Sequence, residues 1–350
     1  MHCGRAQYAP PPVPAPSPSR DADPLPDSPR RPSLLRGTSK PTADAAQLLR
    51  SSLSAVHPSI PPKFFYDDLG SRLFAAITAL DEYYPTRTEA ELLRLHLPAI
   101  AAATPVTGCT FIDVGAGNCE KAARLFATVQ PVCYVAVDIS SDYLGTCLDH
   151  LQRQFPHIEM HGVGTDFSER LDLPPNVPPH RRLFFYPGSS IGNFTPADAI
   201  TFLASLREQM LHDGALWIGV DLQKPTEILE RAYNDDLGVT AAFNRNVLAH
   251  SNRLAGTDFV LADWRHVAFY NDRESRIEMH LQAVRDLEVT WPGGRRRFRA
   301  GERIHTENSY KHRIDGFREL LATAGLRSVG TWTDPAGWFA FFVAVPDARP

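Results

Sequence analysis

Two glycines and a set of acidic residues stand where the sequence predicts the ends of buried strands. Gly115 and Gly117 follow the apolar run 111–114 and precede an amphipathic stretch that begins near Cys119. This order predicts a strand, a tight turn and a helix. Glycines let the backbone bend sharply and come close to a bound molecule, while the start of a helix offers free N–H groups. The turn is therefore a candidate ligand site.

Two further acids follow later apolar or helical segments. Asp138 closes the run 133–137, and Asp166 with Phe167 comes after the next helical stretch. A carboxylate at the second strand end can accept hydrogen bonds from both hydroxyls of a ribose, which serves NAD and S-adenosylmethionine alike. The alternative is that these acids are ordinary solvent-facing residues at strand ends.

The spacing of the glycines distinguishes a site for NAD from a site for S-adenosylmethionine. A dinucleotide fingerprint needs a third glycine at position 120, where this chain has Glu120, so an NAD-dependent oxidoreductase is the least favoured alternative. The segment resembles instead the Asp-x-Gly-x-Gly turn of methyltransferases that use S-adenosylmethionine. That resemblance implies that Asp166 and Phe167 lie beside the adenine ring.

Composition excludes several classes of partner. The 350 residues carry a formal net charge of -4, and their basic residues are scattered, which disfavours nucleic acid. The tight basic cluster 295–297 follows Pro292 and two glycines, so we expect a solvated hairpin. The five cysteines have neither disulfide-framework nor zinc spacing and suit a reducing cytoplasm, and no apolar run is long enough for a bilayer.

Composition and hydrophobic pattern divide the chain into three predicted regions. Residues 1–42 are rich in proline, serine, alanine and arginine and are expected to form a disordered tail. Residues 43–222 together with 312–350 alternate helical and apolar strand segments, which predicts an α/β, Rossmann-like domain of the class I S-adenosylmethionine-dependent methyltransferase type. Residues 223–311 contain two helices and then alternating strands, which predicts an inserted, smaller α+β substrate-binding domain.

Two polar segments are candidates for the substrate site. Asn193 lies in a glycine-rich turn after the apolar strand 182–186, at the sheet edge where open α/β folds bind ligands. Tyr83 and Tyr84 precede a proline and so lie in an extended turn that can present phenols to a cavity. The alternative for both tyrosines is half-buried packing.

Taken together, the motifs resemble the L-histidine Nα-methyltransferases of ergothioneine biosynthesis over about residues 45–345. The signatures that carry the resemblance are Glu82-Tyr-Tyr-Pro-Thr-Arg-Thr-Glu89, Gly188-Ser-Ser-Ile-Gly-Asn-Phe194, Ala232-Tyr-Asn-Asp235, Phe243-Asn-Arg-Asn-Val-Leu248 and Thr306-Glu-Asn-Ser-Tyr-Lys311.

The resemblance implies roles for matched positions. The substrate amine and carboxylate are expected at the catalytic residues Tyr83, Asn193 and Tyr233. The imidazole is expected at Glu307 and Ser309, with Tyr66 nearby and Met279 lining the pocket. Contacts to S-adenosylmethionine are expected from Gly115, Gly117, Lys121, Asp138, Asp166 and Phe167.

These residues predict methylation of the α-amine of L-histidine, three times, to give hercynine and S-adenosyl-L-homocysteine. Transfer from a sulfonium is an in-line displacement that requires positioning, so no metal or covalent nucleophile is expected. We expect a cytoplasmic monomer. Departures at Asn118, Cys119, Asn308 and Tyr310 bear on the substrate rather than on the reaction. The open alternatives are an enzyme of the same fold that acts on another amino acid or an indole amine, and a non-catalytic sensor of S-adenosylmethionine.

Overall fold

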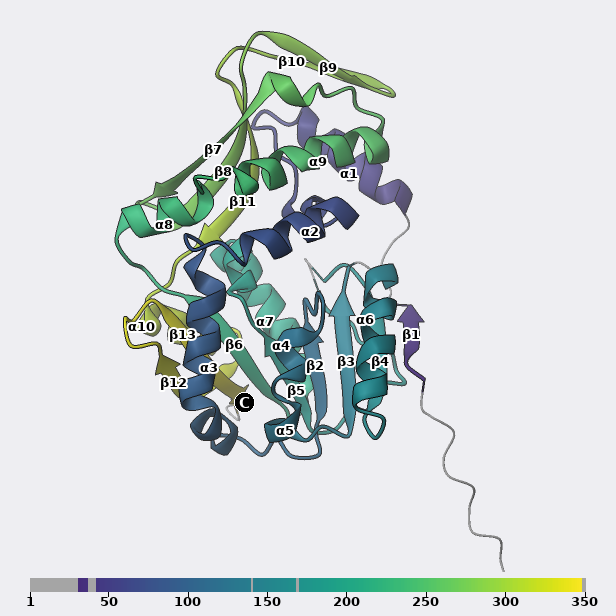
Figure 1. Cartoon of the computed structure of the whole chain (residues 1–350), viewed down its shortest axis with the longest axis vertical. Coiled ribbons are helices and arrows are strands. Elements are labelled where there is room, and N and C mark those ends of the chain that lie inside the picture. Colours follow the sequence, from purple (N-terminus) through teal and green to yellow (C-terminus); the bar gives the residue numbers. More distant parts are fainter. Residues whose placement is uncertain (1–30, 37–41, 140, 168–169, 348–350) are drawn as a thin grey trace, which may run out of the picture.

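The protein consists of a large mixed sheet covered by helices and a smaller lobe above it (Figure 1). The computed structural model describes residues 31–36, 42–139, 141–167 and 170–347. The strands of the large sheet lie in the order β1 (Ser33–Arg36), β4 (Glu159–Gly164), β3 (Cys133–Asp138), β2 (Thr110–Val114), β5 (Arg182–Tyr186), β6 (Ala215–Asp221), β13 (Phe339–Pro346) and β12 (Leu326–Thr333).

The large sheet is doubly wound. Strands β1 to β6 pair in parallel, and β13 runs antiparallel to both of its neighbours. Strand β2 lies between β3 and β5, so successive crossovers leave it in opposite directions and open a crevice at its carboxyl end. The expected Rossmann-like α/β fold is confirmed.

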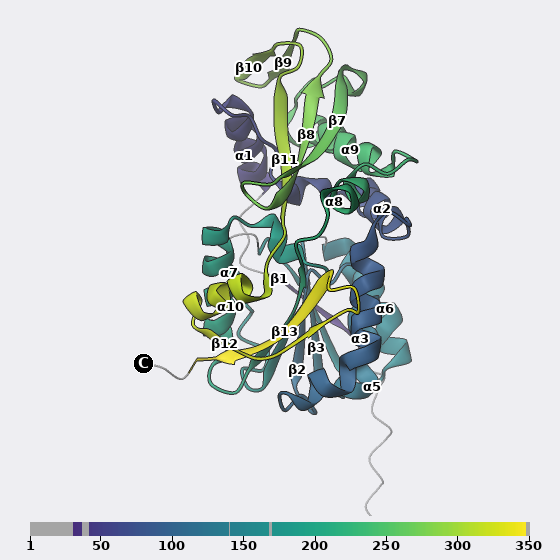
Figure 2. The same cartoon turned by 90° about the vertical axis from the view of Figure 1, so that its left-hand side faces the viewer.

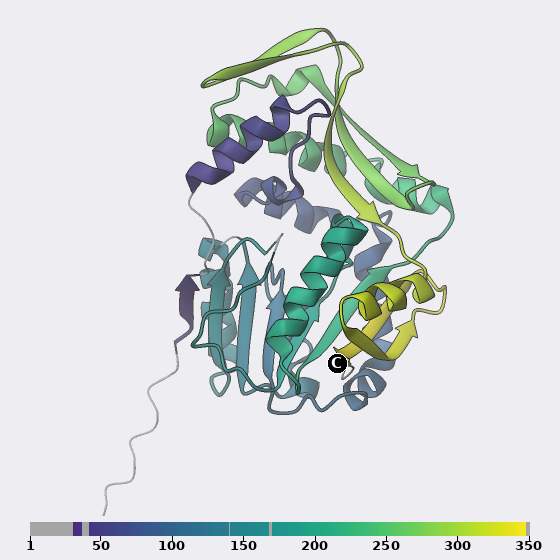
Figure 3. The same ribbon diagram turned by 180° about the vertical axis from the view of Figure 1, so that it is seen from behind.

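Both faces of this sheet are buried under helices (Figures 1 and 3). Alternating residues of one strand enter opposite cores, as where Phe111 packs on one side and Ile112 on the other. The face that contains Phe111 is covered by α3 (Tyr84–Ala102), α4 (Glu120–Ala123), α5 (Phe126–Val129) and α6 (Ser141–Gln154). The opposite face is covered by α7 (Pro196–Met210) and α10 (Ile314–Thr323).

The smaller lobe combines the predicted insertion with the segment before α3. Its elements are α1 (Thr42–Ser54), η1 (Pro62–Phe65), α2 (Asp68–Ile77), α8 (Thr226–Tyr233), α9 (Val239–Ala255), η3 (Leu261–Asp263), the sheet β7 (Trp264–Asn271), β8 (Arg276–Ala283) and β11 (Arg303–Tyr310), and the hairpin β9 (Leu287–Trp291) and β10 (Gly294–Phe298). Leu53 and Phe65 share one buried cluster with Val247 and Ile277. We therefore propose that residues 42–80 belong with the substrate lobe rather than with the sheet.

Several local expectations can be compared with the structure. Ser33–Arg36, expected in the disordered tail, instead forms β1, which pairs with β4; residues 1–30 and 37–41 of that tail lie outside the described residues. The helix expected from Cys119 is divided into α4 and α5. The arginines at 295–297 lie on the expected hairpin. Within the described ranges, no helix has both the length and the apolar composition needed to cross a bilayer.

Three chain crossings in the described segments connect the two lobes, between α2 and α3, β6 and α8, and β11 and α10 (Figure 2). The last two are hydrogen-bonded to each other. The backbone N–H of His312 donates to the carbonyl of Asp221 at 2.9 Å, and that of Gln223 donates to the carbonyl of His312 at 3.0 Å. The lobes are thus held together by backbone bonds as well as by side chains.

The loop after β5 contains the short helix η2 (Ser190–Asn193) and presses against β11. A Cβ atom at Gly192 would lie 2.9 Å from the carbonyl oxygen of Tyr310 and 3.2 Å from its nitrogen. Backbone atoms, unlike a flexible side chain, cannot rotate away from an added methyl group. A glycine is therefore required where the loop after β5 meets β11.

This contact predicts the effect of Gly192→Ala. The added methyl must push η2 off β11, and we expect a loss of about 1–3 kcal/mol of stability, measured by thermal or urea unfolding. The control is Gly316→Ala in α10, where a Cβ meets nothing within 4 Å and the residue is exposed. The control is expected to be neutral or to stabilise by up to about 1 kcal/mol. Equal midpoints for the two variants would contradict the packing argument.

Candidate active site

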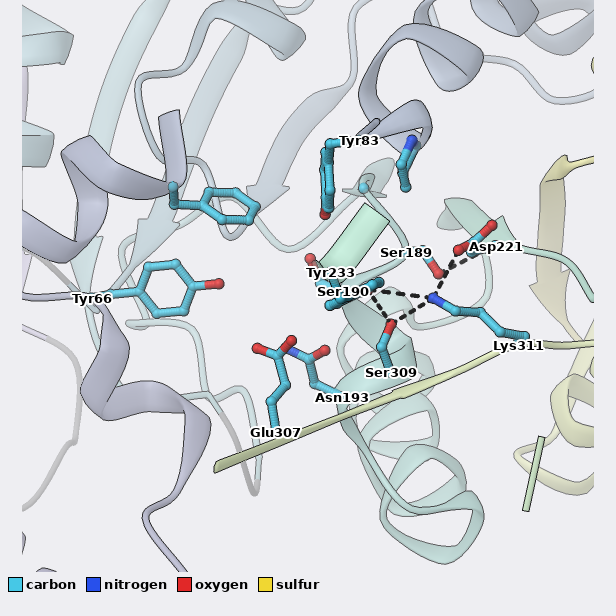
Figure 4. A pocket seen from close by; sticks show the side chains of 13 residues that line it. Tyr66, Tyr83, Ser189, Ser190, Asn193, Asp221, Tyr233, Glu307, Ser309 and Lys311 are labelled. Carbon is cyan, nitrogen blue, oxygen red and sulfur yellow. Dashed lines mark hydrogen bonds and ion pairs between the residues drawn. The ribbon is translucent and has the colours of Figure 1, made fainter. Parts of the chain in front are cut away.

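A cavity opens at the carboxyl edge of the large sheet, beneath the smaller lobe (Figure 4). The cavity and the open space at its mouth together measure about 410 Å³. Both lobes contribute to its lining, which consists of Tyr66, Phe74, Tyr83, Pro85, Gly188, Ser189, Ser190, Asn193, Asp221, Tyr233, Glu307, Ser309 and Lys311.

One wall of the cavity is aromatic. Tyr66 follows η1 directly, and Tyr83 stands immediately before α3. The ring of Phe74 meets Tyr66 edge-on at 5.8 Å and Tyr83 at 6.2 Å, and Tyr83 meets Tyr233 at 6.3 Å. Edge-to-face contacts of this kind fix each ring against the next. The three phenols therefore project from a packed surface.

Burial keeps these phenols protonated. It raises the pKa of Tyr66 and of Tyr83 well above the usual value, and nearby Glu307 raises both further. Burial also raises the pKa of Tyr233. Each hydroxyl is therefore a neutral group that can donate one hydrogen bond and accept others at physiological pH.

The opposite wall is polar. Glu307 and Ser309 are two residues apart on β11, so their side chains share the strand face toward the cavity. Burial raises the pKa of Glu307 to about 7, although the charge of Lys311 opposes this shift. Asn193 lines the same cavity as Glu307. Asn193, like Ser189 and Ser190, comes from the loop that follows β5.

Several polar groups of the cavity are available to a ligand. Among the residues that the structure describes, no hydrogen bond joins a protein group to the Glu307 carboxylate, the Asn193 carboxamide or the hydroxyls of Tyr66 and Tyr83. These atoms face one hollow, and buried polar groups need partners. A ligand that offers both donors and acceptors satisfies them.

A buried ionic network forms the base of the cavity. Asp221, at the end of β6, binds Lys311 at 2.8 Å and Lys224 at 2.5 Å. The hydroxyl of Tyr84 donates to the same carboxylate at 2.6 Å, and Lys224 donates to that hydroxyl at 2.8 Å. Burial opposes ionisation of Asp221, but the two ammonium groups outweigh it and hold the pKa of Asp221 below its usual value.

The predicted cofactor turn has the expected geometry. Gly115 and Gly117 adopt left-handed φ angles of 74° and 54°, which glycine tolerates best. The N–H of Gly117 donates to the carboxylate of Asp138 at 2.9 Å. A Cβ at Gly115 would lie 3.7 Å from the ring of Phe167, and one at Gly117 would meet nothing within 4 Å. The turn, the acid and the aromatic ring therefore meet at one sheet edge.

Two other predicted cofactor residues form ion pairs. Lys121 of α4 binds Glu89 at 2.8 Å, and Glu89 also accepts a hydrogen bond from the N–H of Gly188 at 2.7 Å. The buried Glu89 carboxylate thus connects the cofactor turn to the loop that carries Asn193. Lys63 of η1 binds Asp166 at 2.6 Å across the lobe boundary. Contact of Lys121 and Asp166 with the cofactor stays a prediction.

The structure brings most of the predicted substrate residues together. The exception is Met279, which is buried in the core of the smaller lobe, opposite Glu307 in the β8–β11 ladder, and does not line the cavity. Sequence reasoning missed Glu89 and Asp221. Asp221 had a usable signal, because it ends a strand as Asp138 does.

Outside the cavity, three side chains of the kinds that bind metal ions lie close together. Cys133, Glu159 and His161 gather at the amino ends of β3 and β4, away from the cavity. The ring nitrogens of His161 are bonded to Ser33 at 2.6 Å and to Glu159 at 3.0 Å. Ser33 and Glu159 therefore occupy both ring nitrogens of His161, and the imidazole needs no ion to satisfy it.

The strand order, the glycine turn with its acids and the adjoining polar cavity define a class I S-adenosylmethionine-dependent methyltransferase with a Rossmann-like fold. Residues 45–346 match the model of a family described as histidine-specific methyltransferase, SAM-dependent. The chain belongs to this family.

Curated relatives agree with this assignment. The chain is 43% identical over 310 residues to histidine N-alpha-methyltransferase of Mycolicibacterium smegmatis, covering 85% of this chain and 93% of that protein. It is 40% identical over 305 residues to the protein of the same name from Mycobacterium tuberculosis, with coverage of 84% and 92%. Ergothioneine biosynthesis protein 1 of Neurospora crassa is 32% identical over 284 residues, which cover 78% of this chain and 32% of that protein.

The pKa of Glu307 predicts a pH-dependent stability difference. The folded protein holds a proton on Glu307 that the unfolded chain releases between pH 4.5 and about 7. Stability therefore falls as the pH rises through this interval. Glu307→Gln has no carboxylate and so avoids this loss. We expect the unfolding free energy of the variant, relative to that of the wild type, to rise by on the order of 3 kcal/mol between pH 4.5 and pH 8.

The measurement is urea unfolding of the ligand-free protein at several pH values. The matched control is Glu274→Gln, since Glu274 is exposed in the turn between β7 and β8. Its unfolding curve is expected to follow the wild type within about 0.5 kcal/mol at every pH. If the unfolding free energy of Glu307→Gln changes with pH just as that of the wild type does, the Glu307 carboxylate does not have the raised pKa that its burial implies.

Proposed function

We propose that the protein transfers methyl groups from S-adenosylmethionine to the α-amine of L-histidine and repeats the transfer until the trimethylated product, hercynine, is formed. The observation that carries the proposal is the single cavity in which Glu307 and Ser309 face Tyr83, Asn193 and Tyr233. One set of groups suits an imidazole and the other suits an amino acid's amine and carboxylate. The names of the bacterial relatives support the same substrate.

The cofactor residues fit the chemical groups of S-adenosylmethionine. Gly115 and Gly117 leave space beside the backbone, Asp138 offers a carboxylate for a ribose diol, and Phe167 offers a ring face or edge for adenine. Together with Lys121 and Asp166, these residues would hold the molecule. When bound, it supplies an electrophilic methyl group on a sulfonium centre.

The residues at the amine end orient the nitrogen without capturing its lone pair. The carboxamide of Asn193 provides an acceptor for an amine N–H and a donor for a carboxylate. The hydroxyl of Tyr83, kept neutral by burial, can do the same. The hydroxyl of Tyr233 donates its proton to Ser309, so its oxygen can act toward the substrate only as an acceptor. A methyl transfer needs a neutral, correctly aimed amine, so this combination of weakly basic partners serves positioning.

The residues at the ring end select the side chain. An ionised Glu307 can accept the N–H of an imidazole, and a ring without such a donor leaves a buried carboxylate unpaired. After each transfer the amine gains methyl groups and finally a fixed positive charge. The aromatic wall formed by Tyr66, Phe74 and Tyr83 can attract that charge through cation–π interactions.

We also propose a cytoplasmic monomer. Cys109, Cys119 and Cys133 are buried thiols that form no disulfide, which suits a reducing compartment.

The test is incubation with L-histidine and S-adenosylmethionine, followed by mass spectrometry. We expect a product that carries three added methyl groups. Glu307→Ala is expected to lower kcat/KM for L-histidine by about 100-fold, because the imidazole N–H loses its acceptor. Glu274→Gln, at an exposed site, serves as the control with wild-type activity. A product with one methyl group would refute trimethylation, and an undiminished Glu307→Ala would refute the assigned ring recognition.

A further inference from the structure

Lys311 lines the cavity but directs its charge toward protein groups. Its buried Nζ lies 2.8 Å from a carboxylate oxygen of Asp221, 2.7 Å from Oγ of Ser309 and 3.4 Å from the hydroxyl of Tyr233. An ammonium group has three protons and no acceptor. Lys311 is therefore an obligatory donor to Ser309, and the Asp221 carboxylate balances its charge.

The hydrogen bonds of Ser309 are limited by this arrangement. Its Oγ accepts from Lys311, and it also accepts from the hydroxyl of Tyr233 at 2.7 Å. A serine hydroxyl has two acceptor positions and one proton. Because both acceptor positions are occupied, the hydroxyl of Ser309 is left to act toward the cavity as a donor.

We propose that Lys311, anchored by Asp221, is a positioning residue that fixes Ser309 as a hydrogen-bond donor and so selects a substrate ring with a bare nitrogen as well as an N–H. The inference rests on the proposed function and deepens it. Glu307 accepts the N–H, and Ser309, two residues along the same strand face, donates to the other nitrogen. The pair recognises a neutral imidazole.

The arrangement disfavours two related rings. A pyrrole ring has an N–H but no bare nitrogen, and it leaves the Ser309 proton without an acceptor in a buried site. An imidazolium carries a proton on both nitrogens, and it sets an N–H against the O–H of Ser309. Without Lys311, the hydroxyl of Ser309 can rotate so that a lone pair, rather than its proton, points into the cavity. A pyrrole C–H or an imidazolium N–H beside Ser309 then no longer faces a hydroxyl proton that lacks an acceptor.

Lys224 provides a matched control in the same network. It binds the other oxygen of the Asp221 carboxylate, the hydroxyl of Tyr84 and the carbonyl of Leu222. In the described part of the chain, its Nζ has no hydrogen bond to Ser309 or Tyr233. Replacement of Lys224 therefore removes an equal charge from the same carboxylate and leaves the Ser309 bonds in place.

The experiment compares two ligands by calorimetry in the presence of S-adenosylhomocysteine. The ligands are L-histidine and the amino acid in which a pyrrole replaces the imidazole. We expect the wild type to prefer L-histidine by about 10- to 100-fold. Lys311→Met is expected to reduce this ratio about tenfold, whereas Lys224→Met leaves it unchanged. Where Lys311→Met does not fold, Lys311→Gln replaces it, because an amide is not an obligatory donor.

A double mutant separates positioning from general damage. In a Ser309→Ala background, Lys311→Met is expected to leave the ligand ratio unaltered, since the donor that it orients is absent. The inference is overturned if Lys311→Met keeps the wild-type ratio, if Lys224→Met lowers it equally, or if the effect persists in the Ser309→Ala background. Failure of the wild type to bind or methylate L-histidine would instead overturn the proposed function.

Discussion

The carboxylate of Asp221 is the buried ionic centre on which the contact between the two lobes and the base of the cavity both depend. It lies at the end of a central strand, and its ammonium partners come from chain segments on either side of the smaller lobe, Lys224 before it and Lys311 after it. A buried carboxylate is costly unless charge and hydrogen bonds compensate it. Here they do, and the same groups form the base of the cavity. The stability of the lobe contact and the shape of the site thus have a common origin.

Much of the larger domain could be predicted because its signals are local. Apolar runs such as 133–137 are buried on both sheet faces and end in acids that meet the glycine turn. Positive φ angles at Gly115 and Gly117 follow from the residue type in a strand-to-helix turn. The strands of the insertion could be recognised from their alternating pattern, since one face of each packs on a core.

The remaining features depend on contacts between distant residues. Four residues, Ser33–Arg36, are too few to show a strand pattern, and β1 exists because the edge of β4 offers backbone partners. The segment that includes Leu53 and Phe65 carries helical periodicity, but periodicity does not indicate which lobe the helix packs on. Likewise, Lys311 looks like one more charged residue until the fold places Asp221 and Ser309 beside it.

The crossings between the lobes have a mechanical consequence. Tyr83 stands where the chain enters α3, Asp221 where it leaves β6, and Lys311 where it returns to α10. All three line the cavity. Among the described connections, any rocking of one lobe against the other must be absorbed by backbone rotations at or beside these residues. The segments that connect the lobes therefore also line the binding site, so a ligand bound to these side chains would restrict movement of one lobe against the other.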